Sequence, residues 1–185
     1  DRRPAKPAEA IMTLRSVSVR LAEENNLHDI SLELKAGEVV GIAGVSGNGQ
    51  RTLTDLLGGN LTATSGELVL EGRLITKTSP REFIEAGVAR IPEDRHEVGI
   101  VGEMSIPENL IIESYRDSEF QRGGWMRGRQ IAQYAKSLCD TFDIRGSGEA
   151  QQAKELSGGN IQKLILARVL NKRPRLIIAS QPTRG

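Results

Sequence analysis

The most informative octapeptide of the chain reads Leu156-Ser157-Gly158-Gly159-Asn160-Ile161-Gln162-Lys163. It follows a polar stretch and opens a run with apolar residues at helical spacing, Ile161, Leu164 and Ile165. The spacing predicts a helix whose N-terminal N–H groups and positive dipole end lie at the Ser-Gly-Gly step, where an anion can approach closely. An ordinary serine N-cap with a glycine turn is the alternative. That alternative does not require two glycines followed by Asn160 and Gln162.

Composition favours one soluble domain with a sizeable core. The 185 residues carry a formal net charge of +1, so no sequence-wide field favours nucleic acid or an anionic membrane. Aromatic residues make up only 3% of the chain, which argues against a base-stacking platform, and we expect no nucleic-acid partner. The single cysteine, Cys139, excludes an internal disulfide. No apolar stretch approaches the ~20 residues that span a bilayer.

Hydrophobic patterning predicts alternating strands and helices. Strands are predicted over residues 11–19, 30–34, 67–72, 88–91 and 176–179. The continuous apolar run 39–43 is typical of a buried strand in a parallel sheet. Helices are predicted after a glycine-rich loop at 44–49, from Ser79-Pro80, and within 105–155, where Ile131, Tyr134, Ala135 and Leu138 share one face. This order predicts an α/β core with an inserted α-helical subdomain.

The glycine-rich loop has the context of a phosphate loop, between a predicted strand and a predicted helix. It reads Gly44-Val45-Ser46-Gly47-Asn48-Gly49-Gln50-Arg51-Thr52, and its glycines allow backbone N–H groups to form an anion-binding nest. A working loop of this kind ends in Lys and Ser/Thr, and Gln50 and Arg51 occupy those positions. Thr52 is a candidate metal ligand one residue late. The alternative is a strand-to-helix turn without phosphate function.

Four segments resemble, in this order, the motifs of ATP-binding cassette (ABC) proteins, and the resemblance covers nearly the whole chain from Ile11 to Gly185. They are Gly-Asn-Gly-Gln at 47–50, Pro-Glu-Asp-Arg-His at 92–96, the octapeptide 156–163, and Gln-Pro-Thr-Arg-Gly at 181–185. Together they look like the second (C-terminal) cassette of a tandem ATP-binding subunit of bacterial simple sugar and nucleoside importers. The resemblance implies a P-loop NTPase core of the ABC type, a parallel sheet plus an antiparallel β subdomain, with an inserted α-helical subdomain, C-terminally truncated.

The resemblance also implies a degenerate nucleotide site. Where the family has Asp-Glu at the end of its Walker B strand, this chain has Ser180 and Gln181. Gln cannot take a proton, and losing a general base alone costs on the order of 10²–10⁴ in rate. Glu93 stands where the family has Gln, either as an acceptor for Mg²⁺ or as an ordinary surface residue. We therefore expect no confident catalytic residue or metal ligand, and no hydrolysis by the isolated domain.

In this family two cassettes close head-to-tail, so that ATP with Mg²⁺ lies between one phosphate loop and the opposite signature helix. The resemblance implies that Ser157, Gly158, Gly159, Asn160 and Gln162 act in trans on ATP held by the first cassette of the same polypeptide. It implies membrane permease subunits as partners, an extracytoplasmic solute-binding protein indirectly, and a peripheral place on the cytoplasmic face of the bacterial inner membrane.

The motifs suggest a division into a linker at 1–10, a first part of the nucleotide-binding core at 11–98, a helical subdomain at 99–155, and a second, incomplete part of the core at 156–185. Two other functions stay open. One is a structural pseudo-cassette of the same transporter that binds no nucleotide. The other is a soluble ABC ATPase outside transport, which the balanced charge and the altered loop disfavour.

Overall fold

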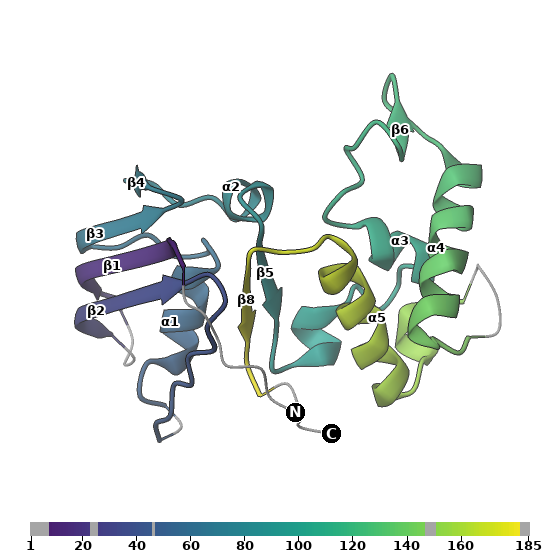
Figure 1. The fold of residues 1–185 in the computed structure, drawn as a ribbon. Coiled ribbons are helices and arrows are strands. Elements are labelled where there is room, and N and C mark those ends of the chain that lie inside the picture. Colours follow the sequence, from purple (N-terminus) through teal and green to yellow (C-terminus); the bar gives the residue numbers. More distant parts are fainter. Residues whose placement is uncertain (1–7, 23–25, 46, 147–150, 182–185) are drawn as a thin grey trace. The chain divides into compact units, whose positions relative to one another are not determined.

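Alternating apolar side chains form the four-stranded antiparallel sheet that Figure 1 shows, in the computed structural model of this chain. The structure describes residues 8–22, 26–45, 47–146 and 151–181. The strands β1 (Ala10–Val19), β2 (Leu27–Lys35), β3 (Ser65–Leu70) and β4 (Arg73–Ile75) stand in the order β2-β1-β3-β4. The strands predicted over 11–19, 30–34 and 67–72 are confirmed, each with slightly different ends.

A bulge in β1 changes which of its residues point toward the core. Met12 and Leu14 before it, and Val17 and Val19 after it, belong to one core cluster, so the positions of β1 in that cluster pass from even to odd numbers. Ser16, with φ 48°, lies at the register shift. Across the bulge, a Cβ on Gly66 would come within 2.3 Å of the Ser16 carbonyl oxygen, so this position needs glycine.

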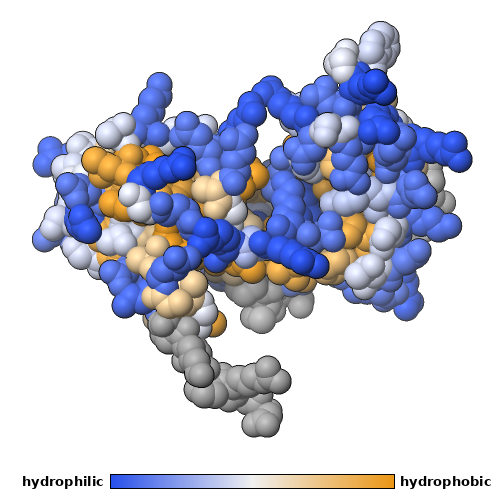
Figure 2. Space-filling view, turned by 45° about the horizontal axis from the view of Figure 1, so that its top comes forward, coloured by the Kyte–Doolittle hydropathy of each residue, from blue (hydrophilic) through white to orange (hydrophobic). Residues whose placement is uncertain are grey.

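Two helices complete the core of the sheet. Helix α1 (Gln50–Leu57) contributes Leu53, Leu56 and Leu57, and ends at Gly58. Helix α2 (Pro80–Glu85) begins after Ser79 and contributes Phe83. The starts of α1 after the glycine-rich loop and of α2 after Ser79, and the end of α1 at Gly58, agree with the sequence pattern. Hydrophobic residues gather over the sheet in the space-filling view (Figure 2).

The predicted buried strand at 39–43 is wrong. None of these residues is in a strand, and Val39 and Ile42 are 98% and 51% exposed. A buried parallel strand needs neighbours on both sides and helices on both faces. Among the described residues, the one parallel pair is β5 (Val88–Ile91) with β8 (Leu176–Ala179). In that pair Leu176 N–H donates to Gly87 O and Ser180 N–H to Ile91 O, so both chains run the same way.

The chain divides into two compact units, each described here by itself. One holds the described residues up to Ala89 and Pro174–Ile178; the other holds Arg90–Arg173 and the described residues from Ala179 on. The second unit contains the π-helix η1 (Arg95–Gly99), α3 (Ile106–Ile111), the hairpin β6–β7 (Gln121–Arg122 and Trp125–Met126), α4 (Gly128–Phe142), the 3-10 helix η2 (Ala153–Glu155) and α5 (Gly158–Asn171).

Helices α3, α4 and α5 pack against one another in the second unit. Helix α4 buries Ile131, Ala135 and Leu138, as the spacing predicts. Helix α5 is more deeply enclosed, and buries Ile161, Leu164, Ile165, Ala167, Arg168 and Val169. The middle of α5 is buried and both of its ends are exposed; the N-terminal end carries the Ser-Gly-Gly step.

Candidate functional site

The octapeptide 156–163 opens α5 with a capped and uncovered N-terminus. Ser157 is the N-cap, and its hydroxyl accepts hydrogen bonds from Asn160 N–H at 3.4 Å and Asn160 Nδ2 at 3.1 Å. A Cβ added to Gly158 or Gly159 would meet nothing within 4 Å. The first N–H groups of a helix have no partner inside it. The site is therefore an open cluster of N–H donors at a positive dipole end, which fits an anion.

Asn160 and Lys163 hold this N-terminus against the end of α4. Asn160 Oδ1 accepts Arg145 N–H at 3.0 Å, and Lys163 Nζ donates at 2.7 Å to both the carbonyl and the carboxylate of Asp143. Asp143 has the left-handed conformation that ends α4. The sequence predicted that Asn160 contacts a ligand. In the structure its side chain instead donates to the Ser157 hydroxyl and accepts from Arg145 N–H.

Arg95 joins the segment 92–96 to the same helix turn. Its Nη1 donates to Gly158 O at 3.3 Å and to Gln162 Oε1 at 3.1 Å. Asp94 holds the start of η1 by accepting from His96 N–H and Glu97 N–H, each at 2.9 Å. Arg95 is a functional candidate that the sequence reasoning missed. The signal was its place within Pro-Glu-Asp-Arg-His, whose partner on α5 lies 63 residues away.

A second arginine fixes the other end of η1 to α5. The buried side chain of Arg168 donates from Nη2 to Gly99 O at 2.7 Å and lies 3.5 Å from Glu113 Oε1. A Cβ on Gly99 would come within 2.5 Å of Ile165 Cδ1. With Arg95 at one end and Arg168 at the other, η1 and α5 are held together at two points.

Glu93, Ser180 and Gln181 follow the ends of two paired strands. Ser180 N–H donates to Ile91 O at 2.9 Å, which places the residue after β8 beside the end of β5. Glu93 follows Ile91 by two positions and is exposed, as is Gln181, whose φ is 45°. The three residues therefore lie just beyond the C-terminal ends of the two paired strands.

The phosphate-loop candidates belong to the first unit. Ser46 lies outside the described residues. Gly47 and Gly49 have φ values of 89° and 80°, and Asn48 N–H donates to Val45 O at 3.2 Å, so the loop turns tightly before α1. Gln50 folds its carboxamide back, placing Nε2 3.0 Å from where a Gly44 Cβ would stand.

The two residues after Gln50 differ in exposure. Arg51 is exposed, whereas Thr52 is 3% exposed within the first turn of α1. The loop thus presents a neutral amide and an arginine where a phosphate loop has an ammonium and a hydroxyl. Among the described residues, no group of three or more His, Cys, Asp or Glu side chains is arranged to hold a metal ion.

Comparison with known proteins assigns the chain. A family profile described as "ABC transporter" matches residues 27–184. The chain belongs to the ABC transporter family.

Named relatives of this ABC domain are import proteins. The chain is 42% identical over its whole length to a glucose import ATP-binding protein, TsgD13 of Haloferax volcanii, and covers 34% of that protein. It is 37% identical to a nucleoside import ATP-binding protein, NupA of Lactococcus lactis, and 38% to a guanosine import ATP-binding protein, NupO of Bacillus subtilis. Both alignments cover the whole of this chain; they cover 37% of NupA and 36% of NupO. The chain thus spans about a third of the length of these relatives.

Solved structures confirm the ABC cassette fold. A dimeric, post-hydrolysis state of the ATP-binding cassette MJ0796 with ADP and Pi matches with a TM-score of 0.71 at 22% identity, over 93% of this chain and 74% of that one. The cassette MJ1267 matches with a TM-score of 0.72 at 25% identity, over 96% of this chain and 71% of that one. In the part of this ABC domain that is described, every helix is too short or too polar to cross a bilayer.

Acid is expected to weaken the contacts that hold the N-terminus of α5. Hydrogen bonds from Lys163 and then Arg145 lower the pKa of Asp143, and those from Glu97 N–H and His96 N–H lower the pKa of Asp94. A lowered folded-state pKa gives stability that is present above the unfolded value of about 4 and is lost as pH falls below it. Urea unfolding at pH 7 and pH 3 should show a smaller loss for Asp143→Asn than for the parent. Asp140→Asn, which removes an exposed carboxylate of α4, should behave like the parent; equal losses in all three would contradict the assignment.

Proposed function

We propose that this chain is a nucleotide-binding domain of an ATP-driven importer of simple sugars or nucleosides, and that it works as the second cassette of a tandem subunit. The names of the relatives support the importer class, since three of them at 37–42% identity are glucose, nucleoside and guanosine import ATP-binding proteins. The proposal places the domain at the cytoplasmic face of the membrane. Its partners are then the first cassette, permease subunits and, indirectly, a solute-binding protein.

Two features support this assignment of roles: the N-terminus of the proposed signature helix is open, and the chain's own phosphate loop is altered. Gly158 and Gly159 leave the α5 N-terminus uncovered, which suits the terminal phosphate of ATP bound by another cassette. Gln50 brings no charge to a phosphate, and Ser180 and Gln181 supply neither the metal-orienting carboxylate nor a general base. The chain therefore acts in trans at the competent site and has at most a non-hydrolytic site of its own.

The residues around the signature motif supply its rigidity. Ser157 and Asn160 cap the helix, Lys163 ties it to α4, and Arg95 holds its first turn from the side. Preorganised donors stabilise developing charge without the cost of reorganisation during the reaction. In this proposal Glu93 follows β5 and begins the segment that leads through Arg95 to the signature helix. Because Arg95 donates to Gly158 O, a displacement of residues 92–96 would displace the first turn of that helix.

A second candidate is the pseudo-cassette that binds no nucleotide. It is favoured by Gln50, whose carboxamide lies against Gly44 within the loop that would hold phosphates. A phosphate would have to displace that side chain without gaining a charge interaction from it. Titration of the chain with a fluorescent ATP analogue and Mg²⁺ tests this candidate: saturable binding contradicts the pseudo-cassette, and absence of binding contradicts a nucleotide site in this chain.

The chain alone is expected to show no ATP turnover above a mock purification. Gln50→Lys should tighten nucleotide binding, because an ammonium replaces a neutral amide at the phosphates, but should add no turnover while Ser180 and Gln181 remain. Groups that act as a unit in catalysis are strongly non-additive. Phosphate release and analogue binding measure the two effects. Turnover by the parent that a Gln181 substitution removes would contradict the proposed degenerate site.

A further inference from the structure

The β6–β7 hairpin presents a tryptophan to solvent. Gln121 pairs with Met126 and Arg122 with Trp125, and the turn between them is Gly123-Gly124, with φ values of 59° and 83°. Trp125 is 82% exposed and Met126 is 50% exposed. Tryptophan carries a large apolar surface and is normally largely buried. An indole exposed near the tip of a hairpin whose strands are two residues long therefore indicates a binding partner.

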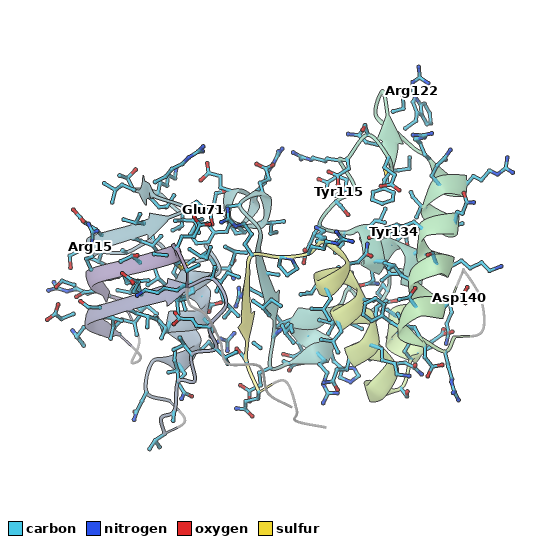
Figure 3. All side chains as sticks on the ribbon, viewed as in Figure 1. Arg15, Glu71, Tyr115, Arg122, Tyr134 and Asp140 are labelled. Carbon is cyan, nitrogen blue, oxygen red and sulfur yellow. The ribbon has the colours of Figure 1, made fainter. Side chains whose placement is uncertain are left out.

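The hairpin is fixed at its base, so its tip is a defined feature. Gln121 N–H donates to Asp117 O at 3.0 Å and Arg127 N–H to Phe120 O at 2.8 Å. Phe120 is buried in a cluster with Ile111 and Ile131, and its ring meets that of Tyr134 edge-on at 4.8 Å. Figure 3 shows Tyr134 below the hairpin and the Arg122 side chain at its tip, pointing away from α4.

Charge is also concentrated here. From Phe120 to Cys139 the sequence holds four basic residues, Arg122, Arg127, Arg129 and Lys136, and no acidic one, in a chain whose net charge is +1. Arg129 and Lys136 are exposed and seven residues apart, so they share the face of α4 opposite Ile131, Ala135 and Leu138. Two acids, Asp117 and Glu119, lie just before this segment. Asp140 lies one turn after Lys136 on the same outer face of α4, so the positive charge is concentrated at the hairpin and the first turn of α4, at Arg122, Arg127 and Arg129, beside the exposed indole.

We propose that this hairpin contacts an anionic phospholipid surface, with Trp125 at headgroup level and Arg122 and Arg129 against the phosphates. Tryptophan prefers the membrane–water interface, and basic side chains are attracted to anionic leaflets. A stable protein interface buries about 800 Å² on each side within a polar rim, whereas a hairpin tip with one Trp and one Met offers little flat area. A soft headgroup layer accommodates such a small protruding tip. This contact requires no nucleotide and is independent of the proposed import function.

Trp125 reports on this contact directly, because it is the only tryptophan in the chain. The chain is mixed with vesicles of phosphatidylcholine alone or with an equal share of phosphatidylglycerol. Only the anionic vesicles should shift the Trp125 emission to the blue and sediment the chain, and about 0.5 M NaCl should reverse most of this binding. Arg122→Gln should weaken partitioning about fivefold, and Trp125→Ala about tenfold or more by sedimentation.

The β3–β4 hairpin provides the matched control, because it also exposes an arginine and an apolar residue, Arg73 and Leu74. Arg73→Gln and Leu74→Ala should bind as the parent does. All four variants change exposed side chains and should keep the parent's unfolding midpoint. Unshifted Trp125 emission, equal binding to neutral vesicles, or sedimentation that survives Trp125→Ala would overturn the proposal. The last result would assign binding to another surface, such as the exposed run 39–43.

Discussion

Gly158→Asp is expected to abolish ATP hydrolysis and transport by the assembled subunit while leaving the fold of this chain intact. A side chain at Gly158 meets nothing within 4 Å, and an acidic residue in the first turn suits the helix dipole, so stability should not fall. In the proposed function, the carboxylate would stand where the terminal phosphate of ATP bound by the other cassette approaches the α5 N-terminus. Two like unit charges at about 4 Å repel by about 4 kcal/mol at an effective dielectric near 20, which corresponds to roughly a thousandfold in rate.

Two further variants serve as controls. One separates the effect of charge at Gly158 from the effect of side-chain size, and the other separates the α5 N-terminus from the chain's own loop. Gly158→Asn has nearly the same shape as Gly158→Asp without the charge, and should retain part of the activity. Arg51→Ala alters only the loop of this chain, and should at most loosen a non-hydrolytic nucleotide. ATPase and uptake assays on the three variants measure these effects. Equally severe loss in Arg51→Ala and Gly158→Asp would mean that the two sites are not divided as proposed.

The second large effect is expected on stability. Asn109 is a fully buried side chain of α3, and its Nδ2 donates to Val101 O, Met104 O and Ser105 O at 3.0–3.2 Å while its Oδ1 accepts Val101 N–H at 2.8 Å. Asn109→Ala removes all four bonds and leaves a cavity. We expect a loss of about 3 kcal/mol in the free energy of unfolding, and a melting temperature lower by roughly 6 to 12 °C.

Asn171→Ala is the comparison for this change. Asn171 makes one exposed side-chain hydrogen bond, from its Nδ2 to Tyr134 Oη at 3.1 Å, so its loss should cost well under 1 kcal/mol. Urea unfolding of both variants gives the two free energies. If Asn109→Ala unfolds no earlier than Asn171→Ala, the network around Asn109 does not stabilise the loop 101–105 as argued. Because Arg168 binds both this region and Gly99, the same network supports the position of η1 on α5.

The sequence alone determined the features that depend on neighbours along the chain. Helical spacing and the Ser-Gly-Gly step placed the start of α5, and Gly58 and Gly59 ended α1. Strand-like apolar patterning found β1 and β3, and clean alternation at 30–34 found β2. Each is a local property, because a cap, a turn or an alternation is decided within a few residues. The order of the motifs also led to the family, which the profile over residues 27–184 confirms.

Only the tertiary structure decided the features that depend on distant partners. The apolar run 39–43 has the pattern of a buried strand, but burial requires neighbouring strands that local pattern cannot supply, and Val39 is exposed. The bulge at Ser16 depends on its pairing with β2 and β3. Arg95 and Arg168 meet their partners on α5 and η1 across 63 and 69 residues. Contacts of that span are set by how helices pack, which is why the sequence predicted the start of α5 but not the arginines that hold it.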